Sequence, residues 1–302
     1  MHRAPRLLLA FLLVTGVAAV PPATRLMASP AGPAAPAQNA QPATLKAAAA
    51  TAADIPFLDA EPQAEQQLLE LANQSRQQAG APPLALDPGL TQAARTHAQA
   101  MLHAHQLSHQ FDGEPSLPQR LASTTNLQLD QEGENVALDY DAGHGHEHLM
   151  LSPPHRANLL NPAYNVVGLG VVRNGDRLFI VQDFGHALPN YTATELKDRI
   201  AIAVNQTRRQ AGQPELHRRD LLVADSVACS MAEADKVATA SARKLAERFT
   251  VLTYTSLHPE TLPNGAAHAI ASRTLRSFSI GACYARTETY PTGVYWVVLS
   301  LE

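Results

Sequence analysis

An internal repeat restricts the fold of this sequence more than any other feature. The segment Asn73–Gly80, with the sequence NQSRQQAG, returns as Asn205–Gly212, with the sequence NQTRRQAG. Leu84 is echoed by Leu216 at the same spacing behind each segment. Similarity of this kind indicates duplication, so the sequence predicts two units built on one plan. The alternative is an unrelated C-terminal fold with a coincidental first helix, and an echo of eight residues argues against it.

The first unit begins with a helical pattern and ends with a strand pattern. Asp87-Pro88 predicts the start of a helix, because aspartate caps well and proline suits the first turn. His97 lies on the apolar face of this helix, where we expect a hydrogen-bonded core histidine. Val166–Val172 and Arg177–Phe184 flank an Asn-Gly turn and predict a hairpin at the centre of a sheet.

Two adjacent prolines interrupt the chain between these patterns. A predicted helix over residues 141–151 carries His144 and His148, which share one face. That spacing either holds a metal or belongs to a solvated surface. Pro153-Pro154 forbids continuation of the helix, so we expect a short turn that presents His155.

Three polar segments follow one another in a characteristic order: Leu107–His109, Gly133–Ala137 and Ser152–Leu160. The ordered set resembles the CAP superfamily of cysteine-rich secretory proteins, antigen 5 and pathogenesis-related proteins, also called the SCP domain. The resemblance covers about residues 64–188 and points to the bacterial secreted branch. It implies an α+β fold: an α-β-α sandwich of the CAP type with a mixed, largely antiparallel sheet. A second, degenerate CAP-like unit is expected to follow, without these polar motifs.

The resemblance also implies a binding cleft. It places His109, Glu134 and His155 there, with His109 and His155 as ligands of zinc or another divalent metal and Glu134 as a further candidate. The residues expected to support the cleft are Asn135, Arg156 and Asn158. The animal and plant members of the family carry a second glutamate on the following helix, but the nearest positions here hold Leu149 and Ser152. The absence of this second glutamate weakens the case for a metal in the cleft and for acid–base chemistry there.

The ends of the sequence predict export and a disulfide. Basic residues ahead of a short apolar run predict a cleaved signal peptide, with an uncleaved membrane anchor as the alternative. Cys229 and Cys283 are expected to pair in an exported protein, and two buried free thiols are the alternative. The expected layout is signal peptide, Ala/Pro-rich linker, CAP domain and degenerate CAP-like repeat, over residues 1–28, 29–58, 59–190 and 193–302.

The expected function is that of a secreted module, in the cell envelope or outside the cell, that binds a ligand or partner. The partner is an unidentified ligand, a lipid or an envelope component, and no stable membrane span is expected after signal cleavage. A net charge of −4 without clustered basic residues excludes the footprint of a nucleic-acid-binding protein. Two alternatives stay open: a metal-dependent hydrolase of extracellular or envelope substrates, and a non-catalytic envelope scaffold. An enzyme is less favoured, because no serine or cysteine has a base at a recognisable spacing.

Overall fold

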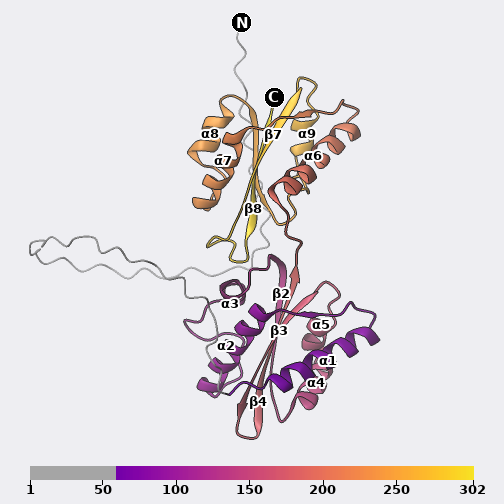
Figure 1. Ribbon diagram of the computed structural model, residues 1–302, viewed down its shortest axis with the longest axis vertical. Helices are drawn as coiled ribbons and strands as arrows, with labels where there is room; N and C mark the ends of the chain where they lie inside the picture. The colour runs from indigo at the N-terminus through magenta and orange to yellow at the C-terminus, as the bar shows by residue number, and fades with distance from the viewer. Residues whose placement is uncertain (1–58) are drawn as a thin grey trace, which may run out of the picture. The chain divides into compact units, whose positions relative to one another are not determined.

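A computed structural model describes residues 59–302 of the chain. The predicted signal peptide and linker, residues 1–28 and 29–58, lie outside the described residues. The described chain forms two sheets in sequence order, each with its own helices (Figure 1). We call residues 62–187 the first half and residues 193–301 the second half.

In the first half, helices cover both faces of a four-stranded sheet. Its elements are α1 (Pro62–Gln78), β1 (Ala85–Leu86), α2 (Pro88–Ala104), α3 (Leu117–Thr124), β2 (Leu129–Asp139), α4 (Ala142–Leu151), α5 (Pro153–Leu159), β3 (Val166–Asn174) and β4 (Arg177–Ala187). The strand order is β1-β3-β4-β2, with β1 parallel to β3 and the other neighbours antiparallel. Helices α1, α4 and α5 pack on one face, and α2 and α3 pack on the other (Figure 1). The predicted α+β class and α-β-α sandwich are confirmed, with the β3–β4 hairpin at the centre.

Local sequence explains where α2 starts and how closely it approaches the sheet. The Asp87 carboxylate accepts a hydrogen bond from the Leu90 N–H at 2.8 Å, and Pro88 occupies the first turn. A Cβ at Gly168 would lie 2.0 Å from the carbonyl carbon of Leu90, so glycine is needed for this helix to rest on β3. This close packing holds the first turn of α2 on the sheet, and the loop that carries His109 follows the end of the helix at Ala104.

The proline pair breaks the helix as predicted, but the segment after it is not a turn. Helix α4 ends at Leu151, and α5 begins at Pro153 and runs for 7 residues. Proline at the first helical position sacrifices no intrahelical hydrogen bond and already has a helical φ. The pair therefore starts a new helix, and His155 lies in its first turn.

The second half repeats the architecture of the first. Its elements are α6 (Ala193–Gln210), β5 (His217–Arg218), α7 (Leu222–Glu233), α8 (Ala240–Ala246), β6 (Thr250–Ser256), α9 (Ala266–Ile270), β7 (Ser277–Ala285) and β8 (Val294–Leu301). The strand order is β5-β7-β8-β6, with β5 parallel to β7 and the other neighbours antiparallel. Helices α6 and α9 pack on one face of this sheet, and α7 and α8 pack on the other (Figure 1).

The repeated sequence segment makes the same contacts in both halves. Arg76 on α1 and Arg208 on α6 are both buried. The Nε of each donates to the carbonyl of the proline six residues later, at 2.7 and 2.9 Å. The Nη1 of Arg76 donates to Leu159 O at 2.8 Å, and the Nη1 of Arg208 donates to Ile270 O at 2.9 Å. The echo therefore encodes a shared packing element, in which backbone carbonyls satisfy a buried guanidinium.

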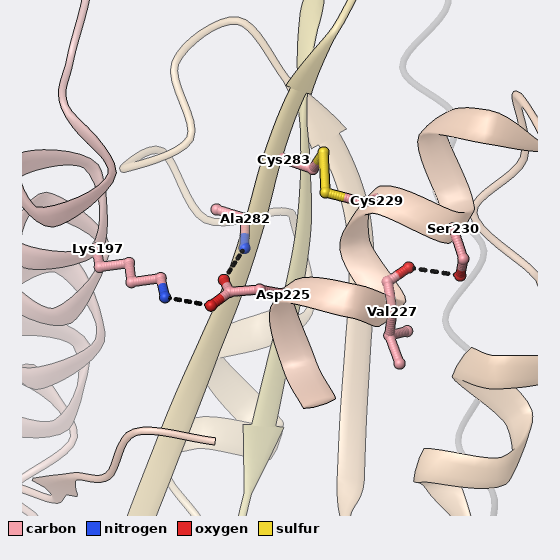
Figure 2. The surroundings of a disulfide bond; sticks show 7 residues. All are labelled: Lys197, Asp225, Val227, Cys229, Ser230, Ala282 and Cys283. Carbon is pink, nitrogen blue, oxygen red and sulfur yellow. Dashed lines mark hydrogen bonds and ion pairs between the residues drawn. A yellow bond between two sulfur atoms is a disulfide. The ribbon is translucent and has the colours of Figure 1, made fainter. Parts of the chain in front are cut away.

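An ion pair joins the corresponding helices of each half, with the charges exchanged. In the first half, Glu65 on α1 pairs with Arg95 on α2 at 2.6 Å. In the second half, Lys197 on α6 pairs with Asp225 on α7 at 2.7 Å (Figure 2). Each carboxylate also accepts a backbone N–H, from β3 in the first half and from β7 in the second, both at 3.2 Å. The position of the pair is thus the same in the two halves, although its polarity is not.

A disulfide joins Cys229 of α7 to Cys283 of β7 in the second half (Figure 2). This is the pairing that the sequence analysis favoured over free thiols. It ties a helix to the sheet across a sequence separation of 54 residues. Within residues 59–302, none of the helices has the length and apolar character that crossing a bilayer requires.

Candidate functional site

Glu134 is the centre of a buried polar cluster in the first half. Its side chain projects from β2 and is 5% exposed. The Oε1 atom accepts a hydrogen bond from Nδ1 of His109 at 2.9 Å, and Oε2 accepts from the guanidinium of Arg120 on α3. Arg120 is equally buried, whereas the His109 side chain is 58% exposed. Both oxygens of Glu134 are therefore engaged, and His109 forms the outer surface of the cluster.

His97 is the core histidine that the sequence predicted, and it positions the loop of His109. Its Nδ1 lies 2.6 Å from Oε1 of Glu114, and its Nε2 lies 2.9 Å from the carbonyl oxygen of Ser108. Both ring nitrogens face acceptors, and the imidazole is fully buried. These contacts hold the chain directly before His109. The His97 Nε2 also lies 3.8 Å from Glu134, so this ring lines the inner side of the cluster.

Asp183 completes the cluster from β4. It pairs with Glu134 in the strand register, is fully buried, and has no hydrogen-bond partner for either carboxylate oxygen among the described residues. Burial, reinforced by the negative charge of Glu134, raises the pKa of Asp183 well above its usual range. The neutral form of Asp183 is therefore favoured. We call His97, His109, Arg120, Glu134 and Asp183 the Glu134 cluster.

A network of amides connects this cluster to α5. The Asn158 amide donates to the carbonyl oxygen of Glu134 at 3.2 Å and to the side-chain oxygen of Asn135 at 3.0 Å. Asn135 donates to the carbonyl oxygen of His155 and to the side chain of Gln182, both at 3.1 Å. Both asparagines therefore brace backbone, while the predicted supporting residue Arg156 is exposed and its guanidinium makes no hydrogen bond to the described residues.

His155 shares the region of the cluster but does not bond to Glu134. Its Nδ1 lies 2.8 Å from Oγ of Ser152. Burial, and then the nearby His109, lowers the pKa of His155. The structure therefore brings His109 and Glu134 into direct contact and ties His155 to them through its backbone carbonyl and Asn135.

Metal ligands are not grouped in the part of the chain that the structure describes. No three or more His, Cys, Asp or Glu side chains between residues 59 and 302 are arranged to hold an ion. The other predicted pair, His144 and His148 on α4, is divided between two carboxylates. His144 bonds Asp141 at 2.8 Å, and His148 bonds Asp139 at 2.6 Å.

The second sheet has uncharged side chains where the first has the acidic members of the cluster. Gly170 packs against the backbone of α2, and Gly281 packs against the backbone of α7. The two glycines therefore occupy equivalent positions in β3 and β7. Counted from these glycines, the strand pairings place Val251 at the position of Glu134 and Ser300 at that of Asp183. The residues at the positions of Asn135 and Gln182 are the apolar Leu252 and Leu299.

Sequence reasoning missed Arg120 and Asp183. Arg120 lies between the segments that carry the polar motifs, and no local pattern shows that its guanidinium reaches Glu134. Asp183 carried a signal, because it is a carboxylate inside an otherwise buried strand, Arg177–Ala187. An ionisable residue at such a position is rarely buried without a purpose.

Comparison with known proteins supports the resemblance for the first half. Residues 69–184 match the CAP family, described as the cysteine-rich secretory protein family. An uncharacterized protein of Bacillus subtilis (strain 168), YkwD, is 31% identical over 112 residues, which are 37% of this chain and 43% of that protein. The chain thus spans less than half the length of this relative.

Solved structures with similarity to this chain include an extracellular protein containing a SCP domain from Bacillus anthracis str. Ames. It has 29% identity and a TM-score of 0.38, over 42% of this chain and 41% of that chain. A second, NaASP2 solved with Zn²⁺, has 14% identity and a TM-score of 0.33, over 44% of this chain and 84% of that chain. The residues that match the CAP family, 69–184, include the whole Glu134 cluster.

Proposed function

We propose that this chain is an exported CAP-domain protein that binds a ligand or partner through the surface formed by His109, His155 and the buried Glu134 beneath them. The ligand is a lipid, a peptide or another component of the medium or cell envelope. The predicted signal peptide and the disulfide support export, since disulfides persist in oxidising compartments. The similar SCP-domain protein from Bacillus anthracis is described as extracellular, which is consistent with export.

The contrast between the two halves carries this proposal. The second half builds the same strand order with Val251 and Ser300 at the positions of Glu134 and Asp183. The architecture therefore does not need a buried acid pair. Burying carboxylates and a guanidinium costs several kcal/mol per ion, by the usual order of magnitude, before their mutual attraction offsets it. A cluster that is costly and unnecessary for the fold is best explained by a binding role.

A resident metal fits the cluster poorly. Both oxygens of Glu134 already accept hydrogen bonds, and the positive Arg120 lies against one of them. The Nδ1 atoms of His109 and His155 are engaged as well, which leaves two imidazole Nε2 atoms. Zinc sites use at least three protein ligands as a rule. We therefore propose metal-independent binding, and equilibrium dialysis against zinc tests this: one tightly bound ion per chain, lost in His109→Ala, would contradict it.

The second half is proposed to be a degenerate CAP-like unit that arose by duplication. The shared strand order, the matching contacts of Arg76 and Arg208, and the exchanged ion pair support this origin. Its exchange of polar for apolar residues indicates a unit that kept its core and lost its site. A hydrolase is not proposed, because no carboxylate within residues 59–302 forms a hydrogen bond with the His155 ring that contacts Ser152.

The experiment is a binding screen of the purified mature protein against arrayed lipids, envelope glycans and peptides. Wild type is compared with His109→Ala and Glu134→Gln, and with His268→Ala, an exposed histidine of the second half, as the matched control. We expect a hit that both cluster variants lose and that the control keeps. Identical profiles for all four proteins would refute the proposed site.

A further inference from the structure

A hollow of about 340 Å³ lies beside α6 in the second half. One wall is a face of α6, and the other is the chain between β6 and α9 together with the start of α9. The residues that matter for its chemistry are Gln206, Thr207, Gln210, Glu260, Leu262 and Asn264. It lies in the half that lacks the Glu134 cluster.

The hollow lies where the first half carries an additional helix. Helices α5 and α9 correspond, because the Nη1 atoms of Arg76 and Arg208 donate to carbonyls at their ends. In the first half, α4 lies between β2 and α5, and its His146 contacts Ser75 of α1 at 2.9 Å. In the second half, the described chain between β6 and α9 contains turns and no helix. Thr207, the counterpart of Ser75 in the repeat, therefore lines the hollow instead of contacting a helix.

Half of the lining residues have polar side chains, and Glu260 is the one ionisable group among them. One oxygen of its carboxyl group, Oε2, is buried and has no hydrogen-bond partner among the described residues. The other oxygen, Oε1, also has no hydrogen-bond partner among the described residues and is not enclosed, so Oε1 is the atom to which a ligand in the hollow would donate. Gln206, Gln210 and Asn264 add amide groups around it, and Thr207 adds a hydroxyl. The lining contains no lysine, arginine or histidine to satisfy the carboxylate from within.

We propose that this hollow binds a small polar cation: an ammonium or guanidinium compound that also carries hydroxyl or amide groups. Its charged group pairs with Glu260, and its polar groups bond to the amides on α6. The volume is at the lower end of the ~300–1,000 Å³ typical of small-molecule sites, which fits a ligand the size of an amino sugar or an amino acid. This inference does not depend on the function proposed for the Glu134 cluster.

Glucosamine and N-acetylglucosamine are matched probes, because acetylation removes the positive charge and keeps the ring and its hydroxyls. Isothermal titration of the mature protein at low salt should show binding of glucosamine and at least about tenfold weaker binding of N-acetylglucosamine. Glu260→Gln should weaken the binding of glucosamine by a similar factor, because it removes a charge-assisted hydrogen bond. Glu233→Gln, an exposed glutamate on α7, is the matched control and should bind as wild type does.

A second variant tests the location rather than the charge. Thr207→Phe fills the hollow and should abolish glucosamine binding, while the fluorescence of Trp296 in β8 reports that the second half is folded. Loss of glucosamine binding in His109→Ala would place the site in the cleft of the first half and would contradict the proposal. Equal binding of both sugars, unchanged binding in Glu260→Gln, or no glucosamine binding by folded wild type would overturn the proposal.

Discussion

Replacing Arg120 by alanine tests how the Glu134 cluster is held together. The two side chains form a direct ion pair, and each is 5% exposed. Removing the guanidinium leaves Glu134 beside the buried Asp183, with the largely exposed His109 as its remaining hydrogen-bond partner. Breaking a buried ion pair from one side costs about 3–5 kcal/mol, because it leaves an uncompensated charge. We expect Arg120→Ala to lower the free energy of unfolding of the first half by that amount.

Replacing both partners should cost far less than replacing one. Glu134→Val introduces the residue that the second half has at the same register position. Arg120 then keeps the Glu114 carboxylate at 3.6 Å and the carbonyl oxygen of His109 at 3.3 Å, so its charge is less well compensated and this single change should also destabilise the first half. In the double variant Arg120→Met/Glu134→Val, no unpaired charge of this ion pair is left. Exchange of a buried pair for apolar groups is often neutral or stabilising by about 1–4 kcal/mol, so the double variant should be close to wild type.

The assay is urea denaturation combined with amide hydrogen exchange of β2 and β4, read by mass spectrometry. Exchange is local, so it reports on the first half even when the chain does not unfold in one step. Arg219→Ala is the control, because its pair with Glu302 is solvent-exposed and should change stability by less than about 1 kcal/mol. The reasoning is refuted if Arg120→Ala costs less than about 1 kcal/mol, or if the double variant is less stable than Arg120→Ala.

Three further predictions concern packing, the disulfide and pH. Gly168→Ala should destabilise the protein by about 3 kcal/mol or more, because its Cβ would meet the α2 backbone at 2.0 Å. The control Gly175→Ala, at φ +64° with open space around it, should cost about 1–2 kcal/mol. Equal shifts of the melting temperature in the two variants would contradict this prediction. Cys229→Ser/Cys283→Ser removes a link across 54 residues and should cost about 4 kcal/mol, as measured by denaturation under non-reducing conditions, and no change would count against a structural disulfide. Burial lowers the pKa of His146 in the folded protein, so the unfolded chain protonates this histidine first as the pH falls. Stability should therefore decrease below about pH 6.5. His146→Gln should flatten this decline, and an unchanged dependence of stability on pH between pH 7 and pH 5 would refute the assignment.

Local signals in the sequence predicted much of the scaffold. Asp87-Pro88 fixed the start of α2 because capping depends on neighbouring residues alone. The Asn-Gly turn predicted the β3–β4 hairpin for the same reason. The proline pair predicted a break, but proline can both end one helix and begin the next, so the seven residues of α5 were mistaken for a turn.

Contacts between distant segments were harder to predict. The bond between His109 and Glu134 was expected through the family resemblance, whereas the partner Arg120 required a view of α3 against β2. The exchanged ion pair of the two halves was also invisible, because each partner alone is an ordinary charged residue on a helix. Apolar periodicity predicts which face of a helix or strand is buried. It does not identify which polar groups form hydrogen bonds or ion pairs with one another across the core.

The most direct test of the central claim is the binding profile of the folded double variant Arg120→Met/Glu134→Val on the lipid, glycan and peptide arrays. The claim is that the Glu134 cluster serves binding and that the fold stands without it. It predicts wild-type exchange protection in β3 together with loss of the hit that wild type gives. Retained binding in this folded variant, at the level of wild type, would contradict it.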